Sequence, residues 1–74
     1  MDVQTLTGDE EAERLRQLIS ARFGGRVRGF LVLVCCGGFV LKGRTGKFHL
    51  KQMVQETVIA ATTFRVVANE IAVD

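Results

Sequence analysis

The chain contains few residues that could act in catalysis or bind a metal. His49 is its only histidine, and the neighbours Cys35 and Cys36 are its only cysteines. A metal site needs three or four clustered ligands, and a nucleophile such as Ser20 or a cysteine needs a base and an orienting acid beside it. The sequence spaces its Cys, His, Asp and Glu residues in neither pattern. We therefore predict a protein that is not an enzyme, with no catalytic residue, no cofactor and no metal site.

The five residues from Gly43 to Lys47, Gly-Arg-Thr-Gly-Lys, are of types that bind anions. They stand where a predicted strand is followed by a predicted helix. Backbone amides at a helix N-terminus attract phosphate, and two cationic side chains would add to that attraction. We therefore predict a binding site for a phosphate or a lipid headgroup, formed by Arg44, Thr45, Gly46 and Lys47.

This segment has other interpretations. It is not a P-loop, because that motif would need glycine at Leu41 and Ser or Thr at Phe48. Gly43 to Gly46 is similar to the Gly-x-x-Gly clamp of KH-type RNA-binding domains, which makes nucleic-acid binding through this loop and the basic segment the alternative function. KH domains place that loop between two helices, and this chain has no Tyr or Trp to stack on bases. We therefore do not expect a nucleic-acid partner. The plainest alternative is a glycine turn whose Thr45 caps the helix.

The charges are unevenly distributed along the chain. The net charge is only +2, from 10 Lys and Arg against 8 Asp and Glu. Five of the acidic residues precede Arg14, whereas the segment from Arg14 to Lys51 has no acidic residue and holds all the basic residues except Arg65. If these cations share a face, that face attracts anionic phospholipid. The alternative is that they are scattered charges that keep the chain in solution.

The pattern of residues 1–23 predicts a tail followed by a helix. Thr7 and Glu10 fit a capping box, and the acids after Thr7 suit the positive end of a helix dipole. Apolar residues then recur every three or four positions up to Phe23, and Gly24 with Gly25 ends the helix. We divide the chain into a flexible tail, residues 1–8, and one domain, residues 9–74.

The rest of the chain predicts three strands and a second helix. Residues 27–36 and 39–42 are two strands joined at Gly37-Gly38, residues 47–61 are a helix, and residues 64–73 are a strand with alternating apolar side chains. The order α-β-β-α-β predicts an α+β fold, a two-layer sandwich with both helices on one face of a three-stranded mixed sheet.

The first strand does not alternate. Residues 30–36, Phe-Leu-Val-Leu-Val-Cys-Cys, are apolar throughout, whereas a strand covered on one face only should alternate apolar and polar residues. We therefore predict that another copy covers the second face, giving a dimer or higher homo-oligomer whose interface includes Phe30, Val32, Leu33 and Val34. The two cysteines are predicted to be buried as small apolar residues and not bonded, because strand neighbours point to opposite faces.

Two motifs together resemble the BON domain, a small bacterial module named after osmotic-shock and nodulation proteins. The hairpin carries Gly37, Phe39, Leu41 and Gly43, and the last strand carries Val67, Asn69, Ile71 and Val73. With the element order, the resemblance covers about residues 9–74. Thr63 replaces a glycine that is usual before the last strand, and the first strand is more apolar than is typical of the family. Gly37, Gly43 and Asn69 are expected to be structural.

The resemblance implies a non-enzymatic interaction module of periplasmic or membrane-associated proteins that binds phospholipid or attaches a larger protein to the cell envelope. The sequence itself shows no secretory signal, because its start is acidic. Gly37-Gly38 interrupts its longest apolar stretch well short of the roughly 20 residues of a spanning helix. We therefore expect a self-associating module, with anionic phospholipid as a second partner and with no transmembrane segment.

Overall fold

The computed structural model describes residues 8–74, and the predicted order α-β-β-α-β is confirmed. The elements are α1 (Gly8–Phe23), a short 3-10 turn (Gly24–Arg26), β1 (Val27–Cys35), β2 (Gly38–Thr45), α2 (Phe48–Ala61) and β3 (Val66–Val73). Residues 1–7 of the predicted tail, and with them the capping role of Thr7, lie outside the described residues, whereas Gly8, which was assigned to the tail, is the first residue of α1. Helix α1 ends at the predicted glycine pair, with Arg22 in its last turn facing the negative end of the helix dipole.

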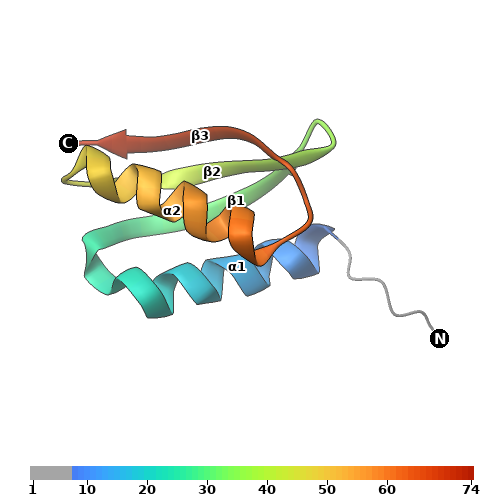
Figure 1. Cartoon of the computed structure of the whole chain (residues 1–74), viewed down its shortest axis with the longest axis horizontal. Coiled ribbons are helices and arrows are strands. Elements are labelled where there is room, and N and C mark those ends of the chain that lie inside the picture. Colours follow the sequence, from blue (N-terminus) through green and yellow to red (C-terminus); the bar gives the residue numbers. More distant parts are fainter. Residues whose placement is uncertain (1–7) are drawn as a thin grey trace.

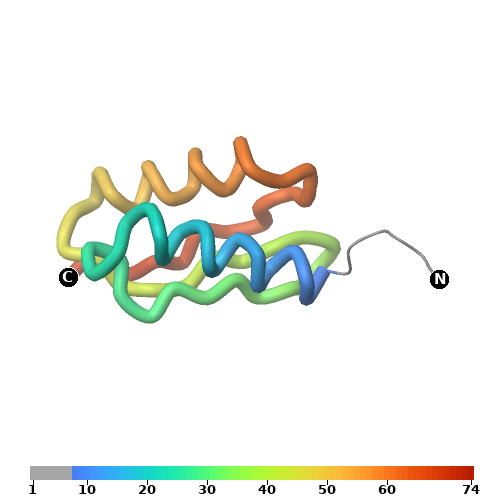
Figure 2. Tube along the Cα trace, turned by 90° about the horizontal axis from the view of Figure 1, so that it is seen from below, coloured from blue at the N-terminus to red at the C-terminus, as the bar shows by residue number. Residues whose placement is uncertain are grey.

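The three strands form one mixed sheet in the order β1-β2-β3. Strands β1 and β2 pair antiparallel as a hairpin, whereas β2 and β3 pair parallel and are joined through α2. Both helices lie on the same face of the sheet, α1 mainly against β1 and α2 against β2 and β3 (Figures 1 and 2). The opposite face of the sheet is not covered by any described element, and we call it the outer face.

The core lies between this sheet and the two helices. Its fully buried apolar side chains come from both helices, from β2 and from β3: Leu15, Ile19, Phe39, Leu41, Val54, Val58 and Ile71. The ring of Phe39 stacks on Phe64, with ring centroids 4.8 Å apart. Because every strand contributes to one apolar layer, the sheet is fixed with a single face toward the helices.

A two-residue turn, Cys36-Gly37, joins β1 to β2, one residue earlier than the sequence indicated. Both residues have positive φ, 57° for Cys36 and 81° for Gly37, as in the type I′ turns that match the twist of a hairpin. The prediction that the two cysteines are buried was wrong. Cys35 and Cys36 are both exposed, because Cys35 lies on the face of the sheet opposite the helices and Cys36 lies in the turn.

A bulge near the start of β1 sets which side chains face the core. Arg28 pairs with Arg44 and Leu31 pairs with Lys42, so Gly29 and Phe30 together oppose the single residue Gly43. Gly29 has a φ of 62°, which is typical of a bulge that begins with glycine in the left-handed region. A Cβ on Gly43 would lie 3.2 Å from the carbonyl oxygen of Arg28.

The bulge has two consequences for the predicted elements. It turns Val27 and Phe30 to the same side, and both are buried against the helices. It also leaves room for β2 to continue to Thr45, three residues beyond the predicted end at Lys42. The segment 43–45, which was predicted to be a connection, is therefore strand.

Candidate functional site: the outer face of the sheet

The outer face is formed by the strand residues that alternate with the core residues. On β1 these are Arg28, Leu31, Leu33 and Cys35; on β2, Val40, Lys42 and Arg44; on β3, Ala68, Glu70 and Ala72. The register places them in rows across the sheet. Leu33 is opposite Val40, which is opposite Ala68, and Leu31 is opposite Lys42, which is opposite Glu70. The face is therefore apolar toward the hairpin turn and charged toward the other end.

The apolar end exposes large side chains that no described element covers. Leu31 is 50% exposed and Leu33 is 44% exposed, although both belong to the central stretch of β1. Single exposed apolar residues are common on protein surfaces, but neighbours on adjacent strands form a continuous patch. We define the outer apolar patch as Leu31, Leu33, Val40 and Ala68.

The charged end of the outer face contains cations and carboxylates that pair with one another. The carboxylate of Asp74 accepts hydrogen bonds from the guanidinium groups of Arg28 and Arg44, the latter at 2.8 Å. These two arginines, Arg44 first, lower the pKa of Asp74. Lys42 Nζ lies 2.7 Å from Glu70 Oε1 on the neighbouring strand. These pairs are solvent-exposed, so they fix the charge pattern more than they stabilise the fold.

The four residues predicted for the oligomer interface do not share one face. Phe30 is only 5% exposed, and Val32 is partly buried against the core. Val34 is exposed but lies beside Gly8 at the start of α1. Leu33 alone of the four lies on the outer face. Leu31 was missed because the bulge shifts the alternation along β1, and the signal for that bulge was the isolated Gly29.

Two of the four residues predicted to bind an anion, Arg44 and Thr45, form side-chain hydrogen bonds within the fold. Arg44 pairs with Asp74, and Thr45 is fully buried, with its hydroxyl donating to the carbonyl oxygen of Arg26 at 2.9 Å. Thr45 therefore does not cap α2; Lys47 occupies the N-cap position without a side-chain hydrogen bond. Gly46 and Lys47 are exposed. Since Gly43, Arg44 and Thr45 belong to β2, the chain does not form a KH-type loop there.

Asn69 links β3 to α2. Its amide nitrogen donates to the carbonyl oxygen of Lys51 and to Oε1 of Gln55, each at 3.1 Å, and its carbonyl oxygen accepts from the backbone N–H of Ile71 at 3.2 Å. A partly buried amide is thus satisfied at both ends. The inferred structural role of Asn69 agrees with these bonds, which join the second helix to the third strand.

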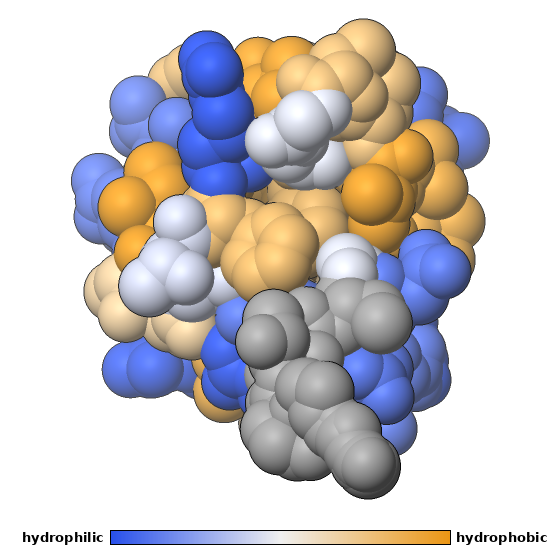
Figure 3. All heavy atoms as spheres, turned by 90° about the vertical axis from the view of Figure 1, so that its right-hand side faces the viewer, coloured by the Kyte–Doolittle hydropathy of each residue, from blue (hydrophilic) through white to orange (hydrophobic). Residues whose placement is uncertain are grey.

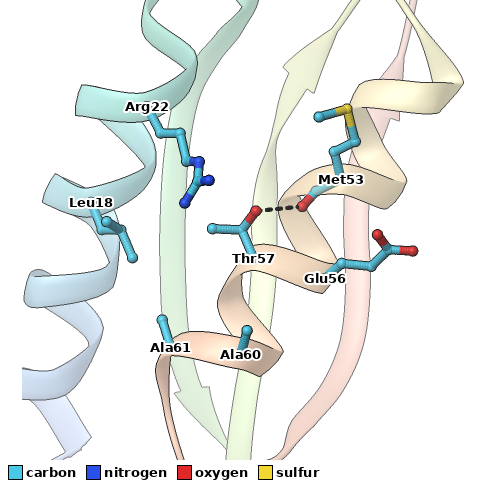
Figure 4. Close-up of a pocket in the computed structure, with 7 residues that line it drawn as sticks. All are labelled: Leu18, Arg22, Met53, Glu56, Thr57, Ala60 and Ala61. Carbon is cyan, nitrogen blue, oxygen red and sulfur yellow. Dashed lines mark hydrogen bonds between the residues drawn. The ribbon is translucent and has the colours of Figure 1, made fainter.

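The described residues offer no catalytic or metal-binding arrangement. His49 is exposed near the start of α2, and residues 8–74 contain no group of three or more His, Cys, Asp or Glu side chains placed to hold a metal. A groove of about 410 Å³ lies between the helices (Figure 4). Arg22 extends into it from α1, and Met53, Glu56 and Thr57 line it from α2.

None of the residues that line this groove forms a nucleophile with a base. The Thr57 hydroxyl donates to the carbonyl oxygen of Met53 at 2.8 Å, one turn back in the same helix. A second cavity, of about 420 Å³, adjoins it at Ala60 and Ala61 and extends to Glu11 and Arg14.

Apolar side chains also gather at one end of the molecule. The view onto the end that carries the β1–β2 turn shows apolar side chains at the top and in the centre, interspersed with hydrophilic ones, which also occupy much of the left and right edges (Figure 3). This end of the molecule therefore also exposes apolar side chains.

Comparisons with known proteins add no family. No protein-family model, no curated protein and no solved structure matches the chain. The resemblance to BON domains therefore rests on the residues quoted for it and stays a prediction. Neither helix within residues 8–74 has the length and apolar character that crossing a bilayer requires.

Proposed function

We propose that the protein is a non-enzymatic interaction module that self-associates through the outer face of its sheet. The observation that supports the proposal is the outer apolar patch, where Leu31 and Leu33 stand about half exposed on a face that no described element covers. Burying the exposed half of such side chains contributes roughly 1 kcal/mol each before the cost of association. A second copy would supply that cover.

The size of the face suits a modest dimer. Three strands about 4.8 Å apart, with eight residues that each rise about 3.3 Å, span roughly 14 by 26 Å. Two such faces total roughly 730 Å² before side-chain relief is counted, which is below the total of about 1,200 Å² at the lower end of stable interfaces. We therefore expect a dimer that dissociates on dilution.

If a two-fold axis parallel to the strands related the two copies, the ends of their outer faces that are alike would meet. Such an axis sets the outer apolar patch of one copy against the same patch of the other, as an isologous interface requires. It also sets the charged ends together. Because that end carries Arg28, Lys42 and Arg44 together with Glu70 and Asp74, ion pairs can form between copies as well as within them.

The ion pairs within the outer face also favour self-association over binding of anionic phospholipid or nucleic acid. The three cations on the outer face are each within bonding distance of a carboxylate, so an incoming phosphate would compete with Asp74 or Glu70. Attachment to phospholipid follows from the resemblance to BON domains. Co-sedimentation with anionic vesicles, compared with neutral vesicles and repeated at high salt, tests it, because surface attraction of about 1 kcal/mol per cation is screened by salt.

Replacing Leu33 with Lys tests the proposed dimer. A charge in the middle of the patch should convert the wild-type dimer into a monomer, measured by light scattering over a range of protein concentrations. Ile59→Lys is the matched control, since Ile59 is 53% exposed but lies on α2; this variant should remain a dimer. Far-UV circular dichroism verifies that both variants fold. A wild-type chain that is monomeric at every concentration, or a folded Leu33→Lys variant that is still dimeric, would contradict the proposal.

A further inference from the structure

The turn of the β1–β2 hairpin brings two thiols together. Cys35 Sγ and Cys36 Sγ are 2.8 Å apart, and both residues are exposed. They are the only cysteines of the chain. Neighbouring residues within a strand point to opposite faces, but Cys36 lies beyond the end of β1, in the turn, where that alternation no longer holds. The exposed tip is therefore a vicinal dithiol.

The backbone of Cys36 is unusual for its residue type. Its φ of 57° lies in the left-handed region, and no other described residue besides glycine has a positive φ. This conformation costs a residue with a Cβ roughly 1–2 kcal/mol, and turns of this kind favour Asn or Gly at the same position. A cysteine held at this cost, with its sulfur beside the only other thiol, points to a use for the pair.

We propose that Cys35 and Cys36 form a reversible thiol–disulfide site, oxidised by a hydroperoxide and reduced again by a small dithiol. The site does not depend on self-association, because both sulfurs belong to one chain and lie at its exposed tip. The proposal assigns a redox modification to two cysteines that the sequence predicted to be buried and not bonded.

The chemistry balances in two steps. The thiolate of Cys36 attacks the terminal oxygen of the hydroperoxide; the O–O bond breaks, an alcohol leaves, and a sulfenic acid forms on Cys36. Cys35 then attacks that sulfur; the S–O bond breaks, water leaves, and the S–S bond forms. The two thiols lose two electrons and two protons, and the hydroperoxide is reduced to alcohol and water. We assign the first step to Cys36 because it stands in the turn at the exposed tip, and the second to Cys35, whose sulfur lies 2.8 Å away.

The bond should be easy to reduce. The Cα atoms of neighbouring residues are about 3.8 Å apart, less than the roughly 4.4 Å at which ordinary disulfides begin. A disulfide closed over that spacing is strained, and strained, exposed disulfides are labile and regulatory rather than structural. The pair is therefore suited to a switch between dithiol and disulfide, with small dithiols as its reductants.

Intact mass with thiol trapping tests this site. The reduced chain should take up two molecules of N-ethylmaleimide. After treatment with tert-butyl hydroperoxide, the monomer should lose two hydrogen atoms and take up none, and dithiothreitol should restore both additions. These results should be the same at every protein concentration and in Leu33→Lys, because the reaction is within one chain. Far-UV circular dichroism before and after treatment verifies that the fold persists.

Single substitutions supply the controls. Cys36→Ser and Cys35→Ser each retain one thiol and should give no product that lacks two hydrogens. Phenylarsine oxide is a second probe of the reduced pair: it condenses with two thiols and releases one water, so the wild-type chain should retain one arsenic atom and each single variant none. Continued uptake of two maleimides after oxidation would overturn the inference. Disulfide-linked dimers that increase with concentration would also overturn it, while they would support contact between copies near the turn.

Discussion

Glu11 should stabilise the fold in a way that depends on pH. It is 4% exposed, and the guanidinium of Arg14 binds its carboxylate through two bonds, Nε to Oε1 at 2.8 Å and Nη2 to Oε2 at 2.7 Å. The same Nη2 donates to the carbonyl oxygen of Ala61 at 2.5 Å, so the pair joins the start of α1 to the end of α2. The bonds from Arg14 and, less strongly, from Thr62 lower the pKa of Glu11 from 4.5 to about 2.

This shift sets the magnitude of the prediction. A pKa lowered by that amount corresponds to at most roughly 3.4 kcal/mol of stability. Because the Arg14 side chain is 48% exposed, solvent screens part of the interaction, and we expect about 1–2 kcal/mol at neutral pH. Glu11→Gln removes the charge and should lower the free energy of unfolding by that amount. Since the pKa is lower in the folded state, the contribution is fully present above about pH 4.5 and is lost as the pH falls toward 2.

Urea unfolding followed by far-UV circular dichroism measures this difference; the chain has no Trp or Tyr for fluorescence. Glu13→Gln is the matched control, because Glu13 makes the same kind of pair with Arg16 three residues on but is half exposed and bonds only within α1. It should leave the midpoint unchanged. If Glu11→Gln unfolds at the same urea concentration as Glu13→Gln, or if its deficit is as large at pH 2.5 as at pH 7, the reasoning is refuted.

Two further substitutions test the geometry of the sheet. Gly38→Ala should destabilise the protein by about 1–3 kcal/mol, since the added Cβ would lie 2.5 Å from the backbone oxygen of Arg65, which has little room to move. Gly46→Ala is the control: its added Cβ would have no atom within 4 Å, so the variant should change the urea midpoint little. Asn69→Ala should cost about 1–2 kcal/mol and expose the hydrogen-bonded amides of β3 to exchange, because three bonds to α2 and β3 are lost. Gln55→Ala removes only one of these bonds and should cost less, so equal losses would contradict the role given to Asn69.

The order of elements could be predicted from the sequence because its signals are local. The pair Gly24-Gly25 follows the end of α1, Gly37 lies in the hairpin turn, and the apolar spacing distinguishes helix from strand. The face of each β1 residue could not be predicted, because residues 30–36 are apolar on both sides and so carry no alternation. The bulge at Gly29 and Phe30 then changes the phase of the strand; the isolated Gly29 is its one local signal, and the pairing with Gly43 fixes its position.

The candidate site, too, could be predicted from the sequence only in part. A basic Gly-Arg-Thr-Gly-Lys segment suggested an anion site, yet Arg44 pairs with Asp74, thirty residues away in the sequence. That pairing depends on the parallel arrangement of β2 and β3, and residue spacing contains no sign of it. Likewise, the exposure of Cys36 follows from a turn that uses a cysteine where turn preferences favour Asn or Gly.

The bulge in β1 also limits how many copies of the chain can add along the edge of the sheet. An edge strand that is long, straight and flat is a template on which further chains add without limit, as in amyloid. In β1 the extra residue opposite Gly43 bends and twists the edge and interrupts its row of free amides. Strand addition along this edge would therefore lose register within a few residues, and filament growth is disfavoured even though nearly every residue after the bend is apolar.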